Sequence, residues 1–126
     1  YIKVKKLSKI VNVFYTSNPF PYIKQADLFI LSSKYEGLPN VLLESIALKK
    51  MVISSDCPTG PKEILLSGKA GLLFKVGNYI ELSKKIIFFI KNKTKCKKML
   101  NTSIKKLDRF DYEINLKKYL YLVKNI

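Results

Sequence analysis

The chain has 126 residues, of which 24 are basic and 9 acidic, so its net charge is +15. This length suits one domain with a hydrophobic core but is small for a complete enzyme with two substrates, and a hydrophobic content of 48% excludes a disordered polycation. With no histidine and only two cysteines, the chain by itself excludes a Ser-His-Asp or Cys-His catalytic arrangement, a disulfide framework and a cysteine-based zinc site of ordinary spacing.

Strand patterns recur along the first two thirds of the chain. Residues 11–15 alternate between apolar and polar side chains and are rich in β-branched and aromatic residues, which predicts a short strand. Three further segments are continuous apolar runs of strand length, as is typical of buried parallel strands. These segments are residues 27–31, 51–54 and 72–74.

Helices are expected between these strands, and each begins near a proline, a residue that favours the first turn of a helix. They comprise a segment from Pro19 or Pro21 to Ala26, residues 39–50 and residues 62–66. Beyond residue 78 the pattern is helical, with helices expected at about 79–92, 94–107 and 111–124. Asn78 is expected to cap the first of these three, and Glu81 completes an arrangement similar to a capping box.

Alternating strands and helices joined by short loops predict an α/β fold with a parallel sheet and flanking helices. No apolar run approaches the about 18 residues of a membrane-spanning helix. Ligands of parallel sheets bind beyond the carboxyl ends of the strands. This rule selects two loops, at 32–39 and 55–61, which hold most of the unusual polar residues.

The first of these loops leads into a helix whose start suits an anion. Gly37 permits close approach of the backbone, and Pro39 removes one amide without cost to the helix. The free backbone amides around Leu38, Asn40 and Val41 are suited to a phosphate group.

Two glutamates flank this anion site. Glu36 precedes the helix, and Glu44 lies about one and a half turns inside it. Both would repel a bare phosphate, but each suits the hydroxyls that a nucleotide-sugar carries at the two ends of its diphosphate. The alternative is that Glu36 only favours the helix dipole and that Glu44 is an ordinary exposed residue. The apolar neighbours of Glu44 favour the first interpretation, because an acid at a core edge needs a partner.

The positive charge is uneven and comes almost entirely from lysine. Lysine supplies 23 of the 24 basic residues, and residues 84–126 carry 13 basic and 3 acidic residues, a net of +10. The densest run lies between Lys91 and Lys98. We interpret it first as a solvated helical surface of biased composition, since specific phosphate and base recognition favours arginine. Attraction to a membrane surface is the second interpretation, and nucleic-acid binding is a further alternative.

Four segments occur in a characteristic order. They are Ala26–Ser33, Glu36–Ala47, Ser54–Leu65 and Gly68–Phe74. Seven residues separate Glu36 from Glu44. With this spacing and order, the chain resembles the retaining glycosyltransferases of family 4, which have the two-domain GT-B architecture. The similarity covers about residues 10–90.

The resemblance implies an incomplete C-terminal half of a GT-B fold. Residues 1–92 would form a partial Rossmann-like domain that binds a nucleotide-sugar, and residues 93–126 a helical C-terminal segment that packs on it. The implied reaction transfers a hexose or N-acetylhexosamine, with retention, from a UDP-linked donor to a glycan or lipid-linked acceptor in surface polysaccharide biosynthesis. No metal or other cofactor and no nucleic-acid partner is implied. The implied location is the cytoplasm, peripheral at the inner face of the membrane.

The same resemblance implies roles for the residues of the first loop. Glu36, as the catalytic residue, would contact the transferred sugar, and Glu44 the ribose. Backbone amides would hold the sugar and the phosphates. The implied substrate-binding residues are Glu36, Gly37, Leu38, Pro39, Asn40, Val41 and Glu44.

Some segments that are typical of the family are not present in this sequence. The acceptor-binding N-terminal domain, the first strands of the C-terminal domain and their basic pair do not precede Tyr1. We therefore expect a longer protein that needs this N-terminal domain for activity. The alternatives are a truncated inactive fragment and a basic module that binds a membrane or nucleic acid.

Overall fold

A three-stranded parallel sheet lies at the centre of the computed structural model, which describes residue 7 and residues 9–125. The strands, in spatial order, are β1 (Leu28–Leu31), β2 (Met51–Ser55) and β3 (Leu72–Phe74). All five residues of β2 are buried, as expected of a central strand. The three predicted apolar strands are therefore confirmed, and their carboxyl ends lie at one edge of the sheet.

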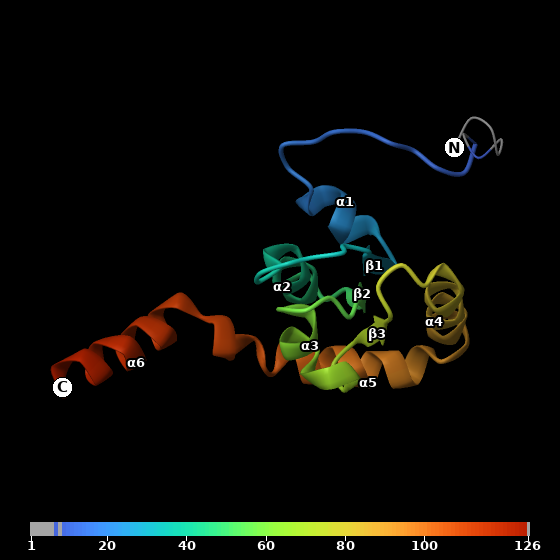
Figure 1. Cartoon of the computed structure of the whole chain (residues 1–126). Helices are drawn as coiled ribbons and strands as arrows, with labels where there is room; N and C mark the ends of the chain where they lie inside the picture. Colours follow the sequence, from blue (N-terminus) through green and yellow to red (C-terminus); the bar gives the residue numbers. More distant parts are fainter. Residues whose placement is uncertain (1–6, 8, 126) are drawn as a thin grey trace.

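Helices pack around this sheet (Figure 1). The α-helices are α1 (Phe20–Gln25), α2 (Asn40–Ala47), α3 (Pro61–Ile64), α4 (Tyr79–Lys91), α5 (Lys93–Ile104) and α6 (Tyr112–Lys124), and the 3-10 helices are η1 (Leu66–Gly68) and η2 (Leu107–Phe110). All six predicted helices are present. The two 3-10 helices were not predicted. The helix α5 ends at Ile104, three residues before its predicted end, and η2 begins at Leu107.

The second helix ends three residues earlier than predicted. Lys49 adopts a left-handed conformation with φ of 59°, and the Lys50 N–H bonds to the Ser45 carbonyl at 2.9 Å. These features form a helix-ending turn that usually contains glycine. Because lysine occupies the left-handed position here, the sequence carries no marker of the helix end.

The hydrophobic core has two parts, one on each face of the sheet. Successive residues of a strand point to opposite faces. Met51 and Ile53 of β2 therefore pack with α4 and α5, whereas Val52 packs with α2 and α3. Helices cover both faces, as expected of a parallel sheet.

The prediction of a strand at residues 11–15 is wrong. This segment has no regular secondary structure, and Val13 and Tyr15 are 80% and 95% exposed. It runs outside the sheet toward α1 (Figure 1). A strand requires a neighbouring strand for its backbone hydrogen bonds, and none of the described residues supplies one at this segment.

Asn78 caps α4 as predicted, but the capping box is only half formed. The Asn78 side chain accepts a hydrogen bond of 3.0 Å from the Glu81 N–H. The Glu81 carboxylate does not return to the Asn78 N–H. It instead accepts a bond of 2.9 Å from the N–H of Lys75, the residue that follows β3. Glu81 thus connects the end of the last strand to the start of α4.

The two last helices differ in their packing. Cys96 of α5 is buried in the same cluster as residues of β2 and β3. No residue of α6 is buried, and the helix projects away from the sheet (Figure 1). The division of the chain at residues 92 and 93 stays a prediction, and residues 1–6, 8 and 126 within its two parts lie outside the described residues. No helix in the described part of the chain combines the length and apolarity needed to cross a membrane.

Candidate functional site

The loops that follow β1 and β2 lie against each other at the carboxyl edge of the sheet. The Ser55 hydroxyl, at the end of β2, donates a hydrogen bond of 2.6 Å to the Ser33 carbonyl. The Thr59 hydroxyl donates a second one to the Glu36 carbonyl. These bonds hold the backbone of the loop that carries Glu36.

Gly60 allows the two loops to come into backbone contact. Its φ of +84° lies in the region that favours glycine. A Cβ atom at this position would overlap the Gly37 carbonyl oxygen and the Pro39 ring. The position therefore requires glycine, and it determines how closely the loop before α2 approaches the loop before α3.

The start of α2 leaves backbone donors unbonded. Pro39 is buried and extended immediately before the helix, and no side chain caps this end. The first bonded amide is that of Leu42, whose N–H donates to the Pro39 carbonyl at 2.9 Å. The N–H groups of Asn40 and Val41 have no acceptor among the described residues. An anion is a suitable acceptor for such groups.

The two predicted glutamates are both partly buried. Glu44 lies one turn after Asn40 on the same face of α2. It borders a hollow of about 310 Å³ whose other walls include Asp108 and Asp111. In the described part of the chain, neither Glu36 nor Glu44 forms an ion pair. Both carboxylates thus remain available to hydroxyl donors.

The chain matches, over residues 3–106, the family described as glycosyl transferases group 1. This match spans most of the chain. The chain belongs to the glycosyl transferases group 1 family.

Similar proteins are much longer than this group 1 chain. An uncharacterized glycosyltransferase of Methanocaldococcus jannaschii is 45% identical over 65 residues, which are 49% of this chain and 16% of that protein. The GalNAc-alpha-(1->4)-GalNAc-alpha-(1->3)-diNAcBac-PP-undecaprenol alpha-1,4-N-acetyl-D-galactosaminyltransferase of Campylobacter jejuni is 27% identical over 125 residues, 99% of this chain and 33% of that protein. The Anabaena protein HepE, solved in complex with UDP, is 20% identical with a TM-score of 0.87, over 99% of this chain and 35% of that chain. The group 1 chain thus spans at most about a third of these three proteins.

The structural likeness confirms the predicted fold class. The group 1 chain has the parallel sheet and flanking helices of the Rossmann-like, C-terminal half of a GT-B glycosyltransferase, and it forms part of that half.

The group 1 domain also has a hollow of about 430 Å³ at the carboxyl edge that sequence reasoning missed. Lys34 and Tyr35 line it from the loop after β1, and Lys75 lines it from the end of β3. The rule that ligands bind beyond strand ends also applies to Lys75, which directly follows the last strand. Asp56 lines the same hollow, and its Oδ2 lies 3.6 Å from the Lys62 Nζ. Lys62 is therefore directed toward Asp56.

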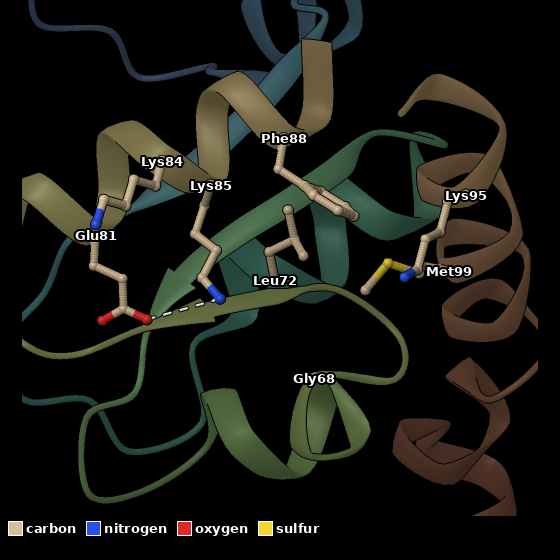
Figure 2. Close-up of a pocket in the computed structure, with 8 residues that line it drawn as sticks. All are labelled: Gly68, Leu72, Glu81, Lys84, Lys85, Phe88, Lys95 and Met99. Carbon is tan, nitrogen blue, oxygen red and sulfur yellow. Dashed lines mark ion pairs between the residues drawn. The ribbon is translucent and has the colours of Figure 1, made fainter. Parts of the chain in front are cut away.

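A larger hollow of about 550 Å³ lies away from both loops, between β3, α4 and α5 (Figure 2). None of the candidate site residues lines it. The candidate site of the group 1 domain and this hollow are separate features.

Proposed function

We propose that the chain is the donor-binding part of a retaining glycosyltransferase of family 4. One observation carries the proposal: Glu36 and Glu44 bracket the unbonded amides at the start of α2, at the carboxyl edge of a parallel sheet. Sheets of this kind bind nucleotides at that edge. Membership of the group 1 family supports glycosyl transfer as the chemistry.

The proposed mechanism uses backbone dipoles and two carboxylates. The N–H groups of Asn40 and Val41 donate to the diphosphate of the donor, within a segment shaped by Gly37, Leu38 and Pro39. They stabilise the charge that develops on the leaving diphosphate, so no metal is needed in this mechanism.

Each carboxylate has its own role in the proposal. Glu44 accepts hydrogen bonds from the ribose hydroxyls, since it lies one turn further along α2 than Asn40. Glu36, which precedes α2 in the chain, is the catalytic residue and contacts the transferred sugar. A charge-assisted hydrogen bond of this kind contributes about 1.5–3 kcal/mol.

The relatives support a choice of donor and acceptor. The Campylobacter jejuni relative is named for transfer of N-acetylgalactosamine to a diphospho-undecaprenol-linked acceptor. The Anabaena structure contains UDP. We therefore propose a UDP-linked hexose or N-acetylhexosamine as donor and a glycan or lipid-linked acceptor, in the synthesis of a surface polysaccharide. The proposed location is the cytoplasm, at the inner face of the membrane, where such a donor and a lipid-linked acceptor meet.

Saturation-transfer NMR of the complete protein tests the proposal, with a panel of UDP-, GDP- and ADP-sugars. We expect saturation transfer to the UDP-sugars, and we expect added UDP to displace them. Weaker transfer in a Glu44→Ala variant would assign the signal to the proposed site. The absence of saturation transfer to every nucleotide-sugar would contradict the proposal.

A further inference from the structure

The corner where α4 meets α5 is strongly basic. Residues 84–98 contain seven lysines and no acidic residue. Of these seven, the described structure pairs only Lys85 with a carboxylate, the Glu81 Oε1 at 3.7 Å. Glu81 also accepts the Lys75 N–H through its other oxygen. The remaining lysines of this corner therefore keep an uncompensated positive charge.

The outer face of α4 combines lysines with exposed isoleucines. Ile80, Lys84, Ile87 and Lys91 are spaced by four, three and four residues, so they form one stripe along the helix. Ile80 is 54% exposed and Ile87 is 50% exposed. The opposite face of α4 packs on the sheet through Phe89. Within the described part of the chain, this stripe is exposed and is both apolar and cationic.

The hollow beside this stripe has an apolar floor and a basic rim. Leu72, Phe88 and Met99 point toward one another from β3, α4 and α5 (Figure 2). Lys84 and Lys95 border the same hollow of about 550 Å³, as do Glu81 and Lys85, which pair with each other.

The aromatic rings beneath this corner hold two of its ammonium groups. The Lys95 Nζ lies 5.4 Å from the centre of the Phe88 ring, and the Lys93 Nζ lies 3.6 Å from that of Phe89. Both ammonium groups are therefore positioned at the boundary between apolar surface and solvent.

We propose that the α4–α5 corner docks on an anionic lipid bilayer. Lysine ammonium groups attract acidic headgroups, and isoleucines on the same face enter the boundary of the acyl chains. Charge complementarity alone would also suit a nucleic acid. However, residues 84–98 contain no arginine, and exposed isoleucines gain nothing from contact with phosphates. The proposal deepens the membrane location given under the proposed function, but no candidate donor-site residue belongs to this surface, so it does not rest on the assignment of the donor site.

Co-sedimentation of the complete protein with vesicles tests the charge component. The probes are zwitterionic vesicles of phosphatidylcholine and anionic vesicles in which phosphatidylglycerol replaces about a third of this lipid. We expect binding to the anionic vesicles only. The triple variant Lys84→Gln, Lys91→Gln and Lys95→Gln should weaken it about 100-fold, since each lysine near the surface contributes about 1 kcal/mol and 1.4 kcal/mol is tenfold.

The matched control removes three exposed lysines from α6, which lies on another side of the molecule (Figure 1). Its substitutions are Lys117→Gln, Lys118→Gln and Lys124→Gln. This control variant should bind the anionic vesicles as the unchanged protein does. An equal loss in both triple variants would overturn the assignment to the α4–α5 corner, as would a lack of vesicle binding by the unchanged protein.

A second variant separates a bilayer from a nucleic acid. Ile80→Ser with Ile87→Ser leaves the charge unchanged and alters only exposed positions, so folding should persist. We expect about tenfold weaker binding to anionic vesicles, because apolar contact area is lost. Unaltered vesicle binding in this variant would refute the bilayer proposal, as would tighter binding of the unchanged protein to duplex DNA than to vesicles.

Discussion

At the scale of single residues, the candidate site depends on backbone groups as much as on side chains. The amides of Asn40 and Val41 are available because Pro39 begins the helix without a capping side chain. Gly60 determines how closely the neighbouring loop approaches them. In the proposed function, the glutamates add selectivity for hydroxyl groups to a site that backbone amides alone would offer to any anion.

Alanine substitution of the glutamates in the complete protein should separate their roles. We expect Glu44→Ala to raise the donor KM, because a ribose contact is present in both the ground state and the transition state. Glu36→Ala should lower kcat more strongly, since its contact is with the sugar that reacts. Each loss should correspond to about 1.5–3 kcal/mol, or about 10- to 150-fold. Glu63→Ala, an exposed glutamate of α3, is the control, and steady-state kinetics of all three variants checks the assignment.

Gly60→Ala should destabilise the protein and weaken donor binding. The added Cβ atom would overlap the backbone of Gly37 and Pro39, and the positive φ is itself unfavourable for alanine. We expect the free energy of unfolding to fall by about 1–3 kcal/mol in urea titrations. Gly68→Ala is the matched control, because Gly68 has a similar φ of +89° but open space around it. Equal losses in the two variants would show that the contact between the loops has no role.

At the scale of elements, the caps of α4 and α6 are expected to differ in their effect on the stability of the fold. Asn78 caps α4, which packs on the sheet through Phe89. Asp111 caps α6 in the same way, with its Oδ1 2.9 Å from the Ile114 nitrogen. No residue of α6 is buried. A lost cap on α4 therefore weakens the folded core, whereas a lost cap on α6 affects only a local helix.

Asn78→Ala should lower the free energy of unfolding of the 126-residue chain by about 1 kcal/mol, because the Glu81 N–H loses its acceptor. Asp111→Ala should leave this value nearly unchanged and reduce only helix content in circular dichroism. Urea unfolding followed by tyrosine fluorescence and by circular dichroism measures both effects. A larger global loss for Asp111→Ala would show that α6 is part of the cooperative core.

At the scale of the whole molecule, large apolar side chains are exposed at both ends of the described chain. Ile10 and Val13 are about 80% exposed before the sheet, and Tyr121 and Leu122 of α6 are 69% and 61% exposed. Neighbouring apolar side chains that are exposed in this way suit contact with another protein surface. We propose a further domain of the complete protein as that surface, since the chain spans no more than about a third of these relatives.

We propose that transfer needs a further domain of the complete protein, so the 126-residue chain alone, which spans at most about a third of the three relatives, should show no transfer activity. Incubation with a UDP-sugar and a lipid-linked acceptor, followed by detection of released UDP, provides the measurement. The complete protein is the positive control. Detectable turnover by the short chain would refute the need for a further domain.

The sequence alone was sufficient to predict most of the fold. Apolar runs, prolines at helix starts and the helical pattern beyond residue 78 are local patterns, and they identified β1, β2, β3 and the six α-helices. The end of α2 was not predictable, because Lys49 occupies a left-handed position where glycine is usual. The strand at 11–15 was predicted wrongly. Its local pattern is typical of a strand, but a strand also needs a neighbouring strand, and the described residues provide none there.

Some features of the candidate site could likewise be predicted from the sequence, whereas others could not. The order of four segments and the spacing of Glu36 and Glu44 led to the predicted resemblance to a glycosyltransferase. The match to glycosyl transferases group 1 confirms this coarser assignment. The contact of Gly60 with Gly37, the hollow that includes Lys75, and the hollow between β3, α4 and α5 bring together residues from different loops, strands or helices. Only the tertiary structure decided these features, because they depend on distances through space that no local pattern encodes.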